Sequence, residues 1–386
     1  MLYTAYDVLY TVCQNCQAHS GLVTALAGTT RREREKRGEP MKALVKYSEG
    51  PGNMEVREVK EPSAGTGQVK IAVEKTGICG SDLHIYHSDI AIPLNPPVVT
   101  GHEFAGTISE TGEAVQGWKV GDRVVSETAY SYCGVCSACR SGFYNLCPER
   151  RTLGYWYNGA FAPYTVVPSA RLHRIPDHIS FDEAALTEPL ACITHAVIEL
   201  SSIKPEDVVL LSGPGSVGLA TLQVARAHGA RVVVAGTSVD DERLKLAKEL
   251  GAADVINVEK ESLADFLSDL TRGTGVDIVL ECSGSERAVD AGMLALKRRG
   301  QYIQIGLFGR PIKINFELVN YRELQVTGSL GSKFSSWEKA LALMASGTVR
   351  TSPLISHRIP LKEWKSAFEM FERKEGLKLL LDPHEA

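Results

Sequence analysis

Three residues with metal-ligating side chains stand close together in one stretch, GICGSDLHIYHSDIAIPLNPPVVTGHEFAG. Cys79 supplies a thiolate, His102 an imidazole and Glu103 a carboxylate. Such a mixed set suits a zinc ion that keeps one coordination position open for a substrate. We therefore predict a catalytic metal site in this stretch.

A second set of possible metal ligands follows in the run YCGVCSACRSGFYNLC. Its four cysteines are Cys133, Cys136, Cys139 and Cys147, with the spacing C-x2-C-x2-C-x7-C. Four thiolates this close can bind one zinc ion tetrahedrally and leave no position for water, which is typical of a structural site. An iron–sulfur cluster uses the same ligand type and is the alternative.

A glycine fingerprint, GPGSVG, lies farther along, between the short apolar run VVLL and the amphipathic segment LATLQVARAHGA. The first glycine of GxGxxG permits a tight turn, the second lets the backbone approach a pyrophosphate, and the third lets the helix pack on the strand. The helix N-terminus then faces the phosphate charge. The predicted dinucleotide loop comprises Gly213, Gly215, Ser216, Val217 and Gly218.

The end of the second predicted strand bears on the choice of coenzyme. NAD-binding enzymes place an acidic residue about 20 residues past the glycine motif, but the sequence VVVAGTSVDDER has Gly236 there. Without that carboxylate a 2′-phosphate is not repelled, and Thr237, Ser238 and Arg243 could donate hydrogen bonds to it. The two aspartates of DDER would oppose this if they point inward. We expect NADP, with NAD as the alternative.

The composition limits the class of protein. The length of 386 residues allows about two or three domains, and 44% hydrophobic residues support sizeable cores. The 42 basic and 46 acidic residues give a net charge of −4, which does not favour nucleic-acid binding. The sequence has no uninterrupted apolar run of about 18 residues, so it does not predict a membrane-spanning helix. Nine cysteines, an odd number with four in metal-type spacing, favour a reducing cytoplasm over a disulfide framework.

The first forty residues differ from the rest, because they lack clean periodicity and end in a basic run. That run follows the apolar stretch instead of preceding it, so the segment does not fit a signal peptide. Cys13 and Cys16 form a CxxC without a second pair nearby. We interpret residues 1–40 as a disordered or artefactual extension, with the globular pattern beginning at Met41.

Two kinds of pattern divide the remaining chain, and together they predict an α/β protein. Up to about Ser169, short alternating segments such as QVKIAV and DRVVS are separated by turn residues, which predicts a β-rich half. Between 208 and 307, apolar strands alternate with helices, which predicts a doubly wound parallel sheet. Helices at 335–345 and 361–373 are expected to return to the first half.

The segments GICGSDLH, GHEFAG, the four-cysteine loop and GPGSVG, in this order, resemble the zinc-dependent medium-chain dehydrogenases from about Met41 to Pro383. Within that family, the adjacent histidine and glutamate of GHEF and the segment TEPLACITHA are most similar to the polyol (sorbitol, L-iditol) dehydrogenases. The resemblance implies a GroES-like β-rich catalytic domain at 41–190 and 335–386. It also implies a Rossmann-type dinucleotide-binding domain at 191–334, and a homodimer or homotetramer.

The resemblance also implies a ligand set for the catalytic zinc, namely Cys79, His102 and Glu103. Glu188 of TEPL would lie beside the metal, either as a fourth ligand or through a bound water. Cys192 is a competing candidate, and the remaining possibility is that no fourth protein ligand exists.

A proton path is implied by the same resemblance. Ser81 would touch the substrate oxygen and His84 would pass the proton on to solvent. A hydroxyl both donates and accepts hydrogen bonds, and a histidine titrates near neutrality, so the pair has the properties of a relay.

The expected reaction is hydride transfer between a secondary alcohol of a polyol-like substrate and NAD(P), the redox chemistry being that of the coenzyme. L-threonine dehydrogenation is the alternative, followed by a secondary alcohol or butanediol, and a non-catalytic NADP-binding protein is the most distant reading. Where polyol enzymes can present an arginine, the sequence GSLGSKFSSW offers only Lys333. The sequence therefore does not identify the residues that contact the sugar chain of the substrate.

Overall fold

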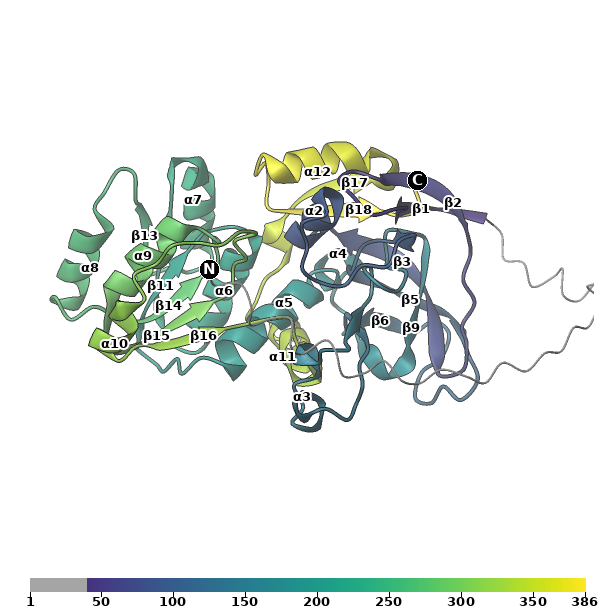
Figure 1. Cartoon of the computed structure of the whole chain (residues 1–386), viewed down its shortest axis with the longest axis horizontal. Coiled ribbons are helices and arrows are strands. Elements are labelled where there is room, and N and C mark those ends of the chain that lie inside the picture. The colour runs from purple at the N-terminus through teal and green to yellow at the C-terminus, as the bar shows by residue number, and fades with distance from the viewer. Residues whose placement is uncertain (1–39) are drawn as a thin grey trace, which may run out of the picture. The chain divides into compact units, whose positions relative to one another are not determined.

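The computed structural model describes residues 40–386, and its elements carry the labels of Figure 1. The strands are β1 (Pro40–Lys46), β2 (Met54–Lys60), β3 (Gln68–Gly77), β4 (Val98–Val99), β5 (Glu103–Thr111), β6 (Arg123–Ser126), β7 (Ala129–Ser131), β8 (Arg151–Thr152), β9 (Tyr164–Pro168), β10 (Leu172–Arg174), β11 (Val208–Ser212), β12 (Arg231–Gly236), β13 (Asp254–Asn257), β14 (Val276–Glu281), β15 (Leu296–Gln304), β16 (Gln325–Gly328), β17 (Ile355–Pro360) and β18 (Lys378–Asp382).

The α-helices are α2 (Gly80–His87), α3 (Ser137–Arg140), α4 (Phe181–Ala184), α5 (Thr187–Thr194), α6 (Ser216–Ala227), α7 (Asp241–Glu249), α8 (Leu263–Thr271), α9 (Glu286–Ala295), α10 (Glu317–Arg322), α11 (Phe334–Ala345) and α12 (Trp364–Glu372). A π-helical turn, His195–Glu199, extends α5. No helix between residues 40 and 386 is long and apolar enough to cross a membrane.

A seven-stranded sheet forms the centre of the β-rich part. Its order is β10-β6-β5-β3-β18-β17, with β9 also paired to β3. Along β3, alternate residues Val69, Ile71 and Val73 are fully buried, as expected where one face of a strand packs on a core. Strands β17 and β18, drawn in yellow in Figure 1, come from the C-terminal end of the chain. Strand β17 pairs with β18, and β18 pairs antiparallel with β3.

A six-stranded parallel sheet forms the coenzyme-type part. Its order is β13-β12-β11-β14-β15-β16, so the chain runs outward from β11 in one direction and then from β14 in the other. This is the order of a doubly wound Rossmann sheet, and ligands bind such sheets at the carboxyl ends of the strands where the order reverses. The predicted fold class, an α/β chain with a β-rich part and a Rossmann-type sheet, is confirmed.

Most predicted elements agree with the structure within one or two residues, and the main differences have local causes. The strand predicted at 301–307 is β15, which begins earlier, at Leu296, and ends at Gln304. Its pairing with β14 shifts register near the start, which breaks the regular alternation that a sequence pattern depends on. Helix α5 accommodates Pro189, because this residue lies in the first turn, where a missing N–H costs little.

Candidate active site

Strand register brings the three predicted catalytic ligands together. Gly77 at the end of β3 pairs directly with Glu103 at the start of β5. Cys79 follows Gly77 by two residues at the N-cap of α2, and His102 immediately precedes Glu103. The ligand atoms of Cys79, His102 and Glu103 all lie within 4.8 Å of one another. In this Cys-His-Glu cluster His102 and Glu103 are buried, at 5% and 1% exposed, and Cys79 is partly buried.

Asp82 supports two members of the cluster. It is buried in the first turn of α2, and its Oδ2 accepts a hydrogen bond of 2.9 Å from the backbone N–H of Cys79. Its Oδ1 lies 3.5 Å from Nδ1 of His102, and neither atom has a hydrogen-bond partner among residues 40–386. A carboxylate beside one ring nitrogen fixes the imidazole and leaves Nε2 to act as a ligand, which is typical of metal-bound histidine. The donor set therefore fits a zinc ion.

Lys378 of β18 binds the third member of the cluster. Its ammonium donates hydrogen bonds to a carboxylate oxygen of Glu103 and to the backbone carbonyl of Ile78. Burial disfavours the charge of Lys378, but Glu103 and Cys79 outweigh this and raise its pKa. A Cβ at position 77 would lie 2.5 Å from Oε2 of Glu103, so glycine makes room for this carboxylate. Because a carboxylate has two oxygens, pairing with Lys378 through one leaves the other for a metal.

Glu188 and Cys192 lie one helical turn apart on α5, close to the cluster. The Cys192 thiol donates to Oε1 of Glu188 over 3.6 Å. Burial raises the pKa of Glu188 to about 7, with His102 opposing the shift and Glu103 reinforcing it. Burial also raises the pKa of Cys192 well above its usual value. Neither residue belongs to the group whose ligand atoms lie within 4.8 Å of one another. The structure thus brings three of the four predicted ligands together and leaves Glu188 nearby.

The two residues of the predicted proton path lie apart. The Ser81 hydroxyl lies at the cluster, 3.4 Å from Nε2 of His102. His84 contacts Asp89 through Nδ1 at 2.9 Å and is partly exposed. Within residues 40–386 no hydrogen bond joins Ser81 to His84, so a proton passing between them needs a bridging water or ligand hydroxyl. The relay stays a prediction.

The four predicted cysteine ligands also converge. Sγ of Cys133 lies 3.9 Å from Sγ of Cys139 and 3.6 Å from that of Cys147. A tetrahedral zinc ion with Zn–S bonds of about 2.3 Å places its sulfurs about 3.8 Å apart. In a [4Fe–4S] cluster each thiolate binds a different iron, so this close spacing favours a single ion over such a cluster. Backbone N–H groups of Val135 and Cys136 lower the pKa of Cys133 to about 7, which favours the thiolate.

The glycine loop joins β11 to α6 at the point where the strand order reverses. A Cβ at Gly218 would lie 1.9 Å from the carbonyl oxygen of Gly213, so the helix can begin here only with glycine. A Cβ at Gly215 would meet no protein atom within 4 Å, so this side of the loop is open. Ser216 and Val217 form the first helical turn, whose N–H groups can bind a pyrophosphate.

Asp240 organises the segment that follows β12. Its Oδ2 accepts hydrogen bonds from N and Oγ1 of Thr237 at 3.1 and 3.0 Å, and its Oδ1 accepts one from Nη1 of Arg243 at 3.1 Å. Arg243 also donates to two backbone carbonyls just past α12. Ser238 lies beside this group, and the strand ends in Gly236 without a carboxylate. Coenzyme preference stays a prediction.

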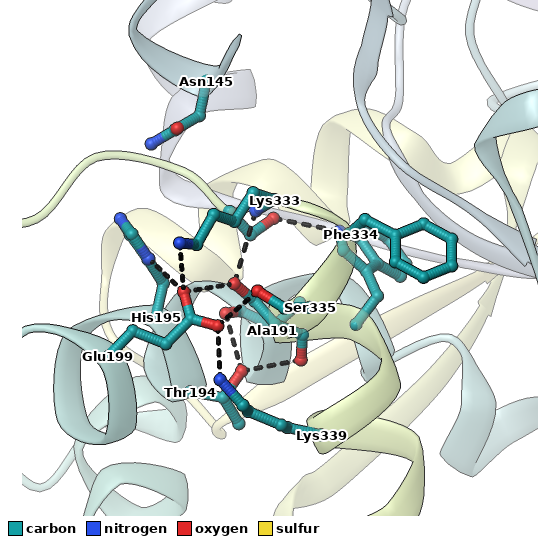
Figure 2. A network of polar contacts seen from close by, with 12 residues as sticks. Asn145, Ala191, Thr194, His195, Glu199, Lys333, Phe334, Ser335 and Lys339 are labelled. Atoms are coloured by element: carbon teal, nitrogen blue, oxygen red, sulfur yellow. Dashed lines mark hydrogen bonds and ion pairs between the residues drawn. The ribbon is translucent and has the colours of Figure 1, made fainter. Parts of the chain in front are cut away.

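A buried carboxylate, Glu199, ties the π-helical turn to the start of α11 (Figure 2). It accepts hydrogen bonds from His195 at 2.7 Å and from Ser335 and Lys339 at 2.6 Å each. The Lys333 ammonium lies 3.6 Å from the same carboxylate. Lys333, the basic residue noted for the substrate side, is therefore paired within the protein.

Three residues around the Cys-His-Glu cluster escaped the sequence reasoning. They are Asp82, Lys378 and Tyr155, whose ring centroid lies 5.3 Å from that of His102. The third position of a helix that begins at Cys79 favours an acidic side chain, so Asp82 could have been found by a search for helix caps. Lys378 is about 300 residues away from Cys79 and no local pattern indicates it.

Comparisons with known proteins agree with this arrangement. The chain matches the family models described as alcohol dehydrogenase GroES-like domain, over residues 65–177, and zinc-binding dehydrogenase, over residues 216–346. It is 45% identical to a sorbitol dehydrogenase of Halalkalibacterium halodurans over 344 residues, which are 89% of this chain and 99% of the relative. It is 38% identical to a D-arabitol-phosphate dehydrogenase of Enterococcus avium over 343 residues, 89% of this chain and 97% of the relative.

A protein of Sinorhizobium meliloti 1021 that was solved bound to NADP has the same fold. The TM-score is 0.80 at 32% identity, with 89% of this chain and all of the other covered. With buried zinc-type ligands, a Rossmann glycine loop and relatives of this similarity over nearly their whole length, the chain belongs to the zinc-dependent medium-chain dehydrogenases, among the polyol and alcohol dehydrogenases.

Proposed function

We propose that the protein oxidises a secondary hydroxyl group of a polyol-like small molecule and transfers the hydride to NADP or NAD. The observation that carries the proposal is the buried Cys-His-Glu cluster, whose ligand atoms lie within 4.8 Å of one another, with the Ser81 hydroxyl at its edge. Similarity to a sorbitol dehydrogenase over 99% of that relative's length supports a polyol as substrate class.

Each residue of the site has a role in this reaction. Cys79, His102 and Glu103 would hold the catalytic zinc ion, which would supply a Lewis acid that lowers the pKa of a bound hydroxyl group. Ser81 accepts the proton of the substrate hydroxyl and passes it through a bridging group toward His84. A bound nicotinamide coenzyme would supply the redox chemistry by accepting the hydride of the carbinol carbon.

Glu188 acts beside the metal, as a fourth ligand or through a water molecule. Its carboxyl group has a pKa of about 7 because it is buried, so it can either hold or release a proton near neutral pH. A carboxylate also competes better than the thiol of Cys192, whose pKa burial raises well above its usual value. Cys192 therefore contributes packing and a hydrogen bond.

The remaining assignments follow the same family pattern. The four cysteines hold a structural zinc ion, and the loop Gly213–Gly218 with Thr237, Ser238 and Arg243 binds the coenzyme. We place the catalytic part at 41–190 and 335–386 and the coenzyme part at 191–334. The assignment of strands to the two large sheets supports this division. We also propose a homo-oligomer that acts on small molecules in the cytoplasm.

Coenzyme reduction with a panel of substrates tests the proposal. Sorbitol and other polyols, L-threonine and butanediol should each be measured with NADP and with NAD. We expect the highest kcat/KM with a polyol and NADP, and loss of both zinc and turnover in Cys79→Ser. Preferred turnover of threonine or butanediol would contradict the substrate class, and a strong preference for NAD would contradict the coenzyme. Coenzyme binding without turnover of any substrate would favour a non-catalytic NADP-binding protein.

A further inference from the structure

Arg150 is a basic residue beside the active site whose side chain has no polar partner among residues 40–386. Its backbone N–H donates to the carbonyl of Cys147 at 3.0 Å, so it closes the turn that follows the last cysteine of the four-cysteine cluster. No hydrogen bond or ion pair joins its guanidinium group to any residue between 40 and 386. An arginine that is largely withdrawn from water normally binds a carboxylate, a carbonyl or an aromatic face.

The surroundings of Arg150 are those of the active site. Burial lowers its pKa, and the nearby ionisable groups of Cys192, Tyr155 and Glu188 oppose that shift. Tyr155 lies against His102, and Glu188 lies beside the Cys-His-Glu cluster. The guanidinium therefore lies on the side of the Cys-His-Glu cluster that Tyr155 and Glu188 occupy.

Gly331 lies against the same guanidinium and leaves room for it because it has no side chain. A Cβ added at Gly331 would lie 3.1 Å from Nη1 of Arg150, so a larger residue there would press on it. The loop that contains Gly331 is held by Asn145, whose side-chain amide donates to the carbonyl of Leu330 at 2.8 Å. The loop that contains Gly331 therefore lies against the arginine and is held there by a hydrogen bond.

Other cations near the site already have partners. Lys378 is paired with Glu103, and Lys333 and Lys339 are both paired with Glu199. In the part of the chain that the structure describes, Arg150 is thus the unpaired cation at this side of the site. A guanidinium offers a planar fork of donors that matches the oxygens of phosphate or carboxylate.

We propose that Arg150 binds an oxyanion carried by the substrate, so that the preferred substrate is an anionic polyol derivative, a phosphate ester or a sugar acid. The inference rests on the proposed polyol oxidation and narrows its substrate class. The similarity to a D-arabitol-phosphate dehydrogenase agrees with a phosphate as the source of the oxyanion. A carboxylate on the same carbon chain offers the same recognition chemistry.

Three compounds with the same six-carbon skeleton separate the possibilities: sorbitol, gluconate and sorbitol phosphate. For the zinc-loaded full chain we expect one anionic compound to exceed sorbitol in kcat/KM by about 10- to 100-fold, the range for hydrogen bonds to a charged group. The better of the two anions identifies the source. Arg150→Met should remove most of this preference, and Arg150→Lys, which keeps the charge but not the fork, should retain part of it.

The matched control is Arg151→Met. Arg151 is the next residue, and its guanidinium lies 4.6 Å from the centroid of the Trp156 ring, so the variant makes the same change of charge one position away. The ratio of anionic to neutral kcat/KM should stay near the wild-type value in this variant. An equal loss in both variants would overturn the specific role of Arg150.

Equilibrium binding gives a readout that does not depend on turnover. With the coenzyme site filled by NADP, inorganic phosphate should bind to the wild type and to Arg151→Met, and at least about tenfold more weakly to Arg150→Met. Equal phosphate affinity in all three proteins, or a raised KM for coenzyme with an unchanged substrate ratio, would overturn the inference. Turnover of sorbitol with no gain for either anion would also overturn it while leaving polyol oxidation intact. Absence of turnover with all three compounds would instead count against the proposed function.

Discussion

The ion pair between Lys378 and Glu103 sets the charge of the Cys-His-Glu cluster. Both side chains are almost completely buried, and the ammonium also donates to the carbonyl of Ile78. Removing one partner of a buried pair leaves an uncompensated charge, which typically costs about 3–5 kcal/mol. The orientation of Glu103, and with it the geometry of the metal ligands, therefore depends on Lys378.

Replacing this lysine tests that dependence. We expect Lys378→Met to lower zinc content and to reduce kcat by at least about tenfold, since changes in the residues that support ligands typically cost about 10- to 100-fold in affinity or activity. Zinc per chain and kcat should be measured on the same preparation. Lys75→Met is the control, because Lys75 pairs with Asp382 across the same two strands but is partly exposed. A similar loss in both variants would show that the effect is one of strand pairing.

The sequence predicted the residues of the site that belong to a local motif, and it did not predict those that reach the site from distant parts of the chain. Cys79, His102 and Glu103 were predicted as one site because their chemical types and the family motifs agree, and the register of β3 and β5 explains why they meet. Lys378 was not predicted, because its contact depends on β18 joining β3 across about 300 residues. Arg150 was missed because a lone arginine after a cysteine motif has no periodic or spacing signal.

At the scale of elements, the junction between the π-helical turn and α11 depends on one carboxylate. Burial disfavours the ionised form of Glu199, but hydrogen bonds from His195, Lys339 and Ser335 outweigh this and hold its pKa well below the usual range. The two elements lie far apart in the sequence, and Figure 2 shows their side chains converging on this group.

The lowered pKa predicts how stability depends on pH. A carboxyl group whose pKa is depressed by folding contributes stability that is complete above the unfolded value of about 4.3 and is lost as the pH falls toward the folded value. We expect Glu199→Gln to lower the free energy of unfolding by about 1–3 kcal/mol at pH 7. The difference from wild type should shrink as the pH is lowered below about 4.3. Denaturant unfolding at a series of pH values measures this.

Glu242→Gln provides the comparison for that experiment. Glu242 pairs with Lys245 on the surface of α7, where both side chains are mostly exposed. Exposed pairs of this kind contribute about 0–1 kcal/mol. A constant difference between wild type and Glu199→Gln across the pH series would contradict the proposed role of the ionised carboxylate.

Elements with clear periodicity were predictable, whereas the helical stretch that leads to Glu199 was only partly so. Strands such as β11 and β14 are short apolar runs between turns, and their bounds match the sequence pattern closely. The π-helical turn was not predicted, because it depends on hydrogen bonds with α11, about 140 residues later. Tertiary contacts of this kind leave no trace in local periodicity.

At the scale of the whole molecule, the four-cysteine cluster supports the connection between the two large sheets. Residues 329–333 lead from β16 of the parallel sheet to α11. Asn145 binds the carbonyl of Leu330, the Tyr144 hydroxyl accepts a hydrogen bond from the N–H of Phe334, and Lys333 lies 4.3 Å from the centroid of the Phe143 ring. The lobe that contains the cysteines is thus fastened to this connection.

Loss of the structural metal should therefore weaken the whole fold. We expect about two zinc ions per chain in the wild type and about one in Cys136→Ser. Thermal unfolding should show Tm lowered by roughly 2–3 °C or more, since with an unfolding entropy of about 2.1 cal/mol/K per residue a loss of about 2 kcal/mol shifts Tm by that amount in a protein of this size. Cys282→Ser, which changes a cysteine outside both metal groups, should keep the zinc content and Tm of the wild type. Two zinc ions in Cys136→Ser would contradict the assignment.

The doubly wound parallel sheet could be predicted from the sequence for a physical reason. Alternation of strands and helices with short links permits few arrangements other than a doubly wound parallel sheet. The return of the chain to the β-rich part depended on the family resemblance, since nothing in the apolar run of β18 indicates that β3 is its neighbour.

The pairing of β18 with β3 has a consequence for biosynthesis. A ribosome makes Cys79, His102 and Glu103 long before it makes Lys378, so the growing chain carries the three ligands while the cation that orients Glu103 is still missing. Zinc that arrives during translation would meet an unfinished site, and the ligand geometry is complete only once the final strand has left the exit tunnel. A premature stop before codon 378 would consequently leave the parallel sheet encoded in full and the catalytic centre without its cation.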